Sequence, residues 1–417
     1  MKSKLTAVLA LVAFVLAASV ASTASATAKA SSLKIYALTS DRTAFEAVLA
    51  VYKKSHPGVK ISITYADVTP YQSTLRTQLA AGTAADVFEV WPGNGNPGAI
   101  QVLAPYHFLA DLSKQAFAKR EPGGIKSVTH VGGKLYTVPL GLSGLGPIYN
   151  MSVLSQLGVG APTTWSQVLS LCSKAKAAGI AAYALGNQDD WVTQLVPYAL
   201  VPTTVYTKVP NFDTLLKAGK TSFPKSGWST AENLYEQMNN AGCFQSNPLA
   251  TNYAATQTML ATGKAAGLVQ GSWAFSDVKK QAPAGTQFKM FPLPATNNPK
   301  DTRMAGAPSA AFAVNAKTKN PEAMKFMDFL GSPKAQATFA RASGNLPAYA
   351  SKTFKPDPSL SVFVGYLRAG KTNPFMDQLW PNPLVQQAHL KGLQDVFAGK
   401  ETMADVLNAM QSAYTSK

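Results

Sequence analysis

Short apolar strands and amphipathic helices alternate along the first part of the chain. From residue 59 to 65 every second side chain is apolar, which predicts a strand with one covered face. Apolar residues then repeat at helical spacing between 45 and 52, behind a capping box that Thr43 and Glu46 would form. Together with strands at 33–38 and 86–90 and a helix over 71–81, this order predicts an α/β domain with a largely parallel sheet.

The rest of the chain is predicted to be richer in helix. One helix is expected to run from its cap at Thr164 to Gly179, and another from a capping box of Ser229 and Glu232 to Gly242. The remaining expected elements are strands at 265–269, 288–291 and 309–314, and helices behind Asn320-Pro321, behind Ser332-Pro333 and from Asn382 onward. The α/β pattern therefore extends over the whole chain.

The first 30 residues have the pattern of a secretory signal peptide. Lys2 and Lys4 precede an apolar run from Leu5 to Val20, and the small residues between 24 and 30 provide A-x-A cleavage sites. A membrane anchor is the alternative, but it would need ~20 residues without early breakers. Since residues 1–30 contain no cysteine, we expect a periplasmic protein that is exported, loses its signal peptide and is not a lipoprotein.

Composition agrees with a folded protein of two or three domains. The chain has 417 residues, of which 46% are apolar and 14% charged. Its net charge of +17 first suggests an anionic partner, and removal of residues 1–30 still leaves +14. The lysines are scattered, however, and no basic run is longer than the pairs Lys53-Lys54 and Lys279-Lys280. A nucleic-acid partner is therefore not expected. Export points the same way, because nucleic acids are mostly inside the cell.

Cys172 and Cys243 are the two cysteines of the chain. In an oxidising compartment we expect them to form one disulfide, with two buried free thiols as the alternative. The loop between them is long. A disulfide that closes it would lower the entropy of the unfolded chain and so stabilise the fold by ~4 kcal/mol.

Motifs for catalysis are incomplete. Residues 93 to 98 match G-x-G-x-x-G, but no acidic residue follows a second strand about 20 residues later, so we interpret them as a polar loop at the carboxyl end of the sheet. The sequence from Gly141 to Gly144 is not a nucleophile elbow, because position 145 is leucine. The four histidines lie far apart and no metal-binding spacing occurs. We therefore expect no metal, no cofactor and no enzymatic activity.

Tryptophans beside turns are the more informative signal. Trp91, Trp191, Trp273 and Trp380 lie in predicted loops, next to aspartate, asparagine, serine or glycine. A single tryptophan is more often part of a core, but four in such surroundings favour a sugar site. Indole rings stack on the apolar C–H faces of a sugar, while carboxylates and amides pair with its hydroxyls.

Several motifs resemble one known family. The segment from Gly132 to Pro139 (GGKLYTVP), followed by Ile148-Tyr149-Asn150, resembles a signature of family 1 extracellular solute-binding proteins. These are the sugar-binding subunits of ABC importers, similar to maltose-binding protein. Further similar motifs follow in the family's order: Ala85-Asp86-Val87, Thr164-Trp165, Gly263-Lys264-Ala265-Ala266, Gly271-Ser272-Trp273, Asn320-Pro321-Glu322-Ala323, Ser332-Pro333 and Gly344-Asn345-Leu346-Pro347.

The resemblance implies a two-lobe periplasmic-binding-protein fold, type II-like, with a hinge between the lobes. Each lobe would be a mainly parallel sheet flanked by helices. The N-terminal lobe would comprise 31–142 and 306–345, and the C-terminal lobe, with both cysteines, 143–305 and 346–417. Ligand would favour closure of the lobes, and the closed, monomeric complex would dock on a membrane permease.

The resemblance also implies which residues face the cleft between the lobes. We expect Trp191 and Trp273 to stack on sugar rings, and Asp41, Asn94 and Asp190 to hydrogen-bond hydroxyl groups. The other expected ligand-binding residues are Ser40, Tyr71, Trp91, Ser143, Ser272, Ser309 and Trp380.

Two alternatives to a neutral carbohydrate remain. The positive charge favours an anionic solute, such as a sugar phosphate, a polyol phosphate or a uronate, which would need lysine or arginine in the cleft. Arg42 is the one arginine in the cleft-facing loops. An exported hydrolase would need a carboxylate pair in one pocket, which the adjacency of Asp189 and Asp190 does not establish. The favoured prediction is the carbohydrate-binding subunit of an ABC importer.

Overall fold

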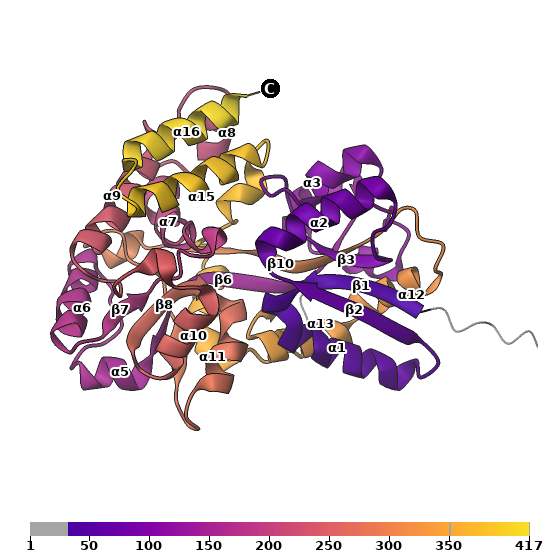
Figure 1. Cartoon of the computed structure of the whole chain (residues 1–417), viewed down its shortest axis with the longest axis horizontal. Helices are drawn as coiled ribbons and strands as arrows, with labels where there is room; N and C mark the ends of the chain where they lie inside the picture. The colour runs from indigo at the N-terminus through magenta and orange to yellow at the C-terminus, as the bar shows by residue number, and fades with distance from the viewer. Residues whose placement is uncertain (1–31, 350–351, 417) are drawn as a thin grey trace, which may run out of the picture.

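The computed structural model describes residues 32–349 and 352–416, so the predicted signal peptide lies outside the described residues. Two α/β halves lie side by side, and long strands run from one to the other (Figure 1). In the described ranges we find no helix with the length and apolar content needed to cross a membrane.

One sheet runs through both halves, which confirms the predicted α/β class. Its strand order is β2 (Lys60–Ala66), β1 (Ser32–Leu38), β3 (Val87–Val90), β10 (Met304–Val314), β6 (Val138–Asn150), β8 (Ala265–Gly271) and β7 (Ala181–Ala184). β1 is parallel to β2 and β3, and β7 is parallel to β8. β6 and β10 are antiparallel to each other. β6 is also antiparallel to β8, and β10 is antiparallel to β3. The short strands are β9 (Phe288–Met290), β11 (Leu346–Pro347), β12 (Thr372–Asn373) and the hairpin of β4 (His130–Val131) and β5 (Lys134–Leu135).

β6 and β10 cross between the two halves. β6 pairs with β10 over 138–145 and with β8 over 145–149, while β10 reaches β3 over 311–314. The sequence pattern did not predict β6, because glycines and prolines interrupt it. The glycines fit tight packing: a Cβ on Gly144 would lie 2.7 Å from the ring of Phe363, and one on Gly146 would lie 2.3 Å from the carbonyl oxygen of Phe291.

Helices cover both faces of the sheet in each half. Around the first half lie α1 (Arg42–Ser55), α2 (Val68–Ala81), α3 (Ile100–Leu103), α4 (Lys126–Thr129), α12 (Glu322–Leu330) and α13 (Pro333–Ser343). The second half carries α5 (Met151–Gln156), α6 (Trp165–Ala177), α7 (Leu195–Val201), α8 (Phe212–Lys217), α9 (Gly227–Asn240), α10 (Tyr253–Ala261), α11 (Phe275–Gln281), α14 (Ser361–Arg368), α15 (Leu384–Phe397) and α16 (Met403–Thr415).

The two predicted capping boxes are wrong, although both helices exist. α1 begins at Arg42, one residue before the predicted cap Thr43, and no side chain caps it. α9 begins at Gly227, where the hydroxyl of Ser226 accepts a hydrogen bond from the Trp228 amide. Glu232 is instead fully buried, 2.8 Å from Nε2 of His389 on α15. Packing between helices therefore outweighed the local capping pattern.

Buried side chains form separate cores in the two halves. Residues before 141 and between 310 and 349 pack into two clusters on the first half, and residues 145–307 with 346–410 form two on the second. We propose the lobe division that the sequence predicted, with one change. Leu346 packs in a core of the second half, whereas Ala348 and Tyr349 pack in the core of the first, so we propose that Ala348 and Tyr349 also belong to the first lobe.

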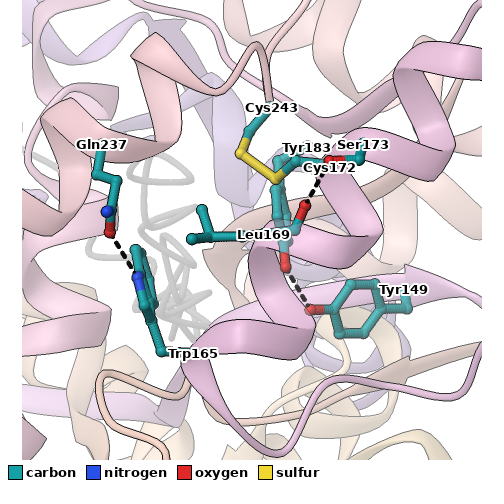
Figure 2. The surroundings of a disulfide bond; sticks show 8 residues. All are labelled: Tyr149, Trp165, Leu169, Cys172, Ser173, Tyr183, Gln237 and Cys243. Atoms are coloured by element: carbon teal, nitrogen blue, oxygen red, sulfur yellow. Dashed lines mark hydrogen bonds between the residues drawn. A yellow bond between two sulfur atoms is a disulfide. The ribbon is translucent and has the colours of Figure 1, made fainter.

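A disulfide joins Cys172 on α6 to Cys243, just after the end of α9, as predicted. Both cysteines are fully buried in the core of the second half. Two hydrogen bonds flank the bridge in Figure 2: Nε1 of Trp165 donates to Gln237 of α9, and the hydroxyls of Tyr149 and Tyr183 meet at 2.8 Å. The bridge therefore holds helices of one half together and lies away from the junction between the halves.

Candidate functional site

A cavity lies between the two halves and is lined by both. Its walls come from the ends of β1 and β3, the start of α2 and the centre of β10 on one side, and from α7, α15 and the segments around residues 190, 273 and 377 on the other. The space between the lining atoms, counting the open mouth, is about 1020 Å³.

Three of the six tryptophans line this cavity. Trp91, Trp191 and Trp273 are partly exposed and lie in the lining, whereas the other three are buried in the core of the second half. The first of the three comes from the first half and the other two from the second half. Indole rings thus line the cavity on both halves.

Neighbouring rings contact all three indoles, and glycines lie against two of them. A Cβ on Gly98 would lie 2.8 Å from the Trp91 ring, and one on Gly271 would lie 2.1 Å from the Trp273 ring. Each indole also makes an edge contact with one aromatic ring: Trp91 with Tyr71, Trp191 with Tyr253 and Trp273 with Phe375. Such bracing fixes the orientation of each ring before a ligand arrives.

Four carboxyl groups also line the cavity: Asp41, Glu89, Asp190 and Asp377. Asp41 and Glu89 are hydrogen-bonded to each other, and Glu89 also accepts from the Leu38 amide at 2.8 Å. Burial raises the pKa of Asp41 to about 6, despite its hydrogen bond to Glu89. Burial and the charge of Asp41 hold the pKa of Glu89 well above its usual range.

Asp377 belongs to a chain of amides at one end of the cavity. Burial raises the pKa of Asp377 to about 6, and the Gln386 amide donates to its carboxyl at 3.1 Å. Gln386 also donates to Gln194 and accepts from Asn96, whose own oxygen accepts from Gln72. The chain therefore joins α2 and the loop after β3, on the first half, to α15 on the second.

Other hydrogen bonds cross between the halves around the cavity. Thr69 donates to Asp190 at 3.1 Å, and Thr43 donates to Asp277 of α11 at 3.2 Å. The Asn94 amide donates to the Pro381 carbonyl. The described arrangement is therefore one in which both halves contact each other around the cavity.

Seven of the predicted ligand-binding residues lie in the cavity lining, and five lie elsewhere. Ser143 and Ser272 are buried where β6 and β10 cross, and both donate to the Asn345 side chain. Trp380 is 2% exposed and packs against Trp228 in the core. The seven in the lining are Ser40, Asp41, Trp91, Asp190, Trp191, Trp273 and Ser309.

Tyr71 and Asn94 lie next to the cavity without lining it. Tyr71 is fully buried, and its hydroxyl donates to the Glu89 carbonyl at 2.7 Å while its ring contacts Trp91. The Asn94 side chain is turned toward Pro381 on the other half. Both residues support the lining: one positions Trp91, and the other joins the halves.

Sequence reasoning missed several lining residues. Glu89 carried a signal, since a carboxylate within the apolar strand Val87–Val90 is costly unless it has a use. Asp377 and Gln386 carried none, because their segments lie far after β3 in the sequence and only the fold brings them together.

Comparison with known proteins identifies the family of the chain. Residues 36–337 match the family model described as bacterial extracellular solute-binding protein. The chain belongs to the bacterial extracellular solute-binding proteins, which confirms the predicted family.

The relatives are distant but cover most of the chain. A multiple sugar-binding protein of Streptococcus mutans is 23% identical over 72% of this chain and 70% of its own. A putative binding protein of Brucella abortus is 24% identical over 89% of this chain and 85% of its own.

Solved structures confirm the two-lobe fold. The binding protein RafE in complex with raffinose superposes with a TM-score of 0.76 at 20% identity, over 93% of this chain and all of that one. A sugar transporter of Bacillus licheniformis in complex with stachyose gives a TM-score of 0.75 at 18% identity, over 92% and 99%.

Proposed function

We propose that the protein is the carbohydrate-binding subunit of an ABC importer and captures a sugar or oligosaccharide between its lobes. One observation carries the proposal: the three partly exposed tryptophans all line the cavity, interleaved with carboxylate, amide and hydroxyl groups. Flat apolar faces beside hydrogen-bonding groups match the two kinds of surface on a sugar ring. The names of the relatives, which include a multiple sugar-binding protein, support the same ligand class.

Capture depends on closure of the two lobes. Because the indoles and carboxyls come from both halves, a ligand makes all its contacts only when the halves meet, so binding favours the closed form. We propose that the closed, monomeric complex then docks on a membrane permease. In this proposal the mature protein acts in the periplasm after losing residues 1–30.

The cavity disfavours the anionic alternative. Its lining, taken over the described residues, contains four acidic side chains and no lysine or arginine. Arg42, the arginine that the sequence placed nearest, stacks over the Tyr65 ring with its guanidinium 4.6 Å from the ring centre. A phosphate or uronate would therefore meet negative charge without a cation to balance it.

The carboxyl pair of the cavity also lacks the geometry of a glycosidase. Carboxyls that cleave a glycosidic bond flank it and stand ~5–9.5 Å apart. Asp41 and Glu89 are hydrogen-bonded directly to each other, which leaves no room for a scissile bond between them. The family to which the chain belongs consists of binding proteins, and we propose a binding role for this chain as well.

Replacing Trp273 with alanine tests the stacking role. We expect affinity for the best sugar of a thermal-shift panel to fall by ~1–3 kcal/mol, because the indole face is lost. Calorimetric titration measures the change. Trp273→Phe should retain most of the affinity, and Tyr106→Ala, which removes a 64% exposed ring outside the cavity, should leave it unchanged. Unchanged affinity in Trp273→Ala would remove this indole from the site.

A further inference from the structure

Ala310 has a backbone conformation that alanine rarely adopts. Its φ is 46°, in the left-handed region that glycine occupies without strain. Two other described non-glycine residues have a positive φ, His107 and Asn247, and each lies next to a 3₁₀ turn. Ala310 lies instead inside strand β10, where extended backbone is the rule. Strain of this kind persists only where the surrounding structure imposes it.

The strained residue lies where β10 passes from one half to the other. Ala307 packs in the core of the second half, whereas Ala310 packs in the core of the first. Ser309 pairs with Gly141 of β6, and Ala311 pairs with both β6 and β3. Ala310, between them, has no pairing partner in the described sheet. A change in the angle between the halves therefore turns the backbone of β10 at or near this residue.

A buried polar cluster joins the crossing segments at the same place. Ser143 of β6 is hydrogen-bonded to Ser309 of β10 and donates to Oδ1 of Asn345, just before β11. Ser272, which follows β8, donates to the same oxygen. The amide nitrogen Nδ2 of Asn345 is buried and has no hydrogen-bond partner among the described residues. It lies against Gly141, where a Cβ would be 3.0 Å from it, and an unpaired buried donor is costly.

We propose that this crossing point is a strained hinge, formed by Ala310 and the cluster around Asn345, that opposes closure of the lobes. Both the left-handed backbone and the unpaired amide raise the free energy of the described arrangement, in which the halves contact each other around the cavity. When the halves separate, β10 relaxes toward ordinary strand geometry and the amide gains a partner. The inference rests on the lobe closure of the proposed function and adds what sets its equilibrium.

A strained hinge has two consequences for binding. It lowers the fraction of unliganded protein in the closed form, and the apparent affinity for ligand falls by the same factor. It also raises the free energy of the closed complex, which favours opening and release of the ligand. Relief of the strain should therefore make the protein hold its ligand more tightly.

Replacing Ala310 with glycine removes the strain at the loss of one methyl group. Glycine adopts a positive φ readily, so the closed form should become more stable relative to the open form. Ala313→Gly is the matched control, because Ala313 is also buried in β10 and has no positive φ.

Closure can be measured without any ligand. The side chains of Thr69 and Asp190 meet between the halves at 3.1 Å, so in a Thr69→Cys/Asp190→Cys protein a short thiol crosslinker joins the two positions only when the halves meet. The native cysteines are already bridged and do not react. We expect Ala310→Gly to raise the rate of crosslinking about tenfold, and Ala313→Gly to leave it unchanged.

Ligand affinity gives a second measurement. In proteins that keep Thr69 and Asp190, calorimetry with the best carbohydrate of a thermal-shift panel that includes raffinose and stachyose should show tighter binding by Ala310→Gly, by a similar factor. Ala313→Gly should bind as the wild type does.

The outcomes separate this inference from the proposed function. An unchanged crosslinking rate in Ala310→Gly, an equal rise in Ala313→Gly, or unchanged affinity for a carbohydrate that binds would overturn the strained hinge and leave the sugar-binding function standing. Faster crosslinking in Ala310→Gly together with failure of every carbohydrate to bind would support the hinge and overturn the proposed function.

Discussion

Replacing Gly95 with alanine should weaken ligand binding about 100-fold. A Cβ on Gly95 would lie 2.0 Å from the carbonyl oxygen and 2.7 Å from the carbonyl carbon of Asp377, on the opposite half. Backbone atoms cannot move aside as a flexible side chain can, so the loop after β3 would be held away from the second half. Overpacking of this kind costs about 3 kcal/mol, and that cost falls on the closed form.

The unliganded fold should tolerate the same change. Because the clash lies between the two halves rather than inside one, we expect the melting temperature of the unliganded Gly95→Ala protein to stay close to that of the wild type. Gly123→Ala is the matched control, since a Cβ there meets no atom within 4 Å. Ligand affinity is measured by calorimetric titration. If Gly95→Ala binds ligand as tightly as the wild type, the two halves do not come into contact at Gly95 when ligand binds.

Removal of the disulfide should have the largest effect on stability. Cys172 and Cys243 are 71 residues apart, and closing a loop of that length restricts the unfolded chain by about 4 kcal/mol. For the double variant Cys172→Ala/Cys243→Ala we expect the unfolding temperature measured by scanning calorimetry to fall by roughly 5 °C. Alanine is chosen because both positions are fully buried.

Reductant provides the control for this variant. The wild type unfolded in the presence of reductant should match the double variant, and the double variant itself should not respond. Sugar affinity below the transition should be unchanged, since neither cysteine lines the cavity. Equal unfolding temperatures for the oxidised wild type and the double variant would contradict a stabilising bridge.

The sequence predicted the elements whose own pattern specifies them. The strand at 33–38, the helix from Thr164 and the disulfide all appear, because alternation, a local cap and compartment chemistry are visible in short segments. The residue pattern alone did not indicate β6, because its glycines pack against Phe363 and Phe291, partners far away in the sequence. The predicted capping boxes are absent: Thr43 donates to the distant Asp277, and Glu232, the expected partner of Ser229, is paired with the distant His389.

The site was predicted as far as loop tryptophans and their neighbours indicate it. Trp91, Trp191 and Trp273 lie in the cavity, but nothing local distinguishes them from Trp380, which the packing around Trp228 buries. The carboxyl pair of Asp41 and Glu89 exists only because β1 and β3 are neighbours in the sheet. A pair of carboxyl groups that forms because two strands are neighbours cannot be predicted before the strand order is known.

Small-angle X-ray scattering with and without ligand tests the central claim most directly. Using the tightest carbohydrate from the thermal-shift panel, the account predicts a smaller radius of gyration for the complex than for the free protein, and recovery of the carbohydrate unchanged. An identical radius with every carbohydrate that binds, or any conversion of the carbohydrate to product, would contradict capture by closing lobes.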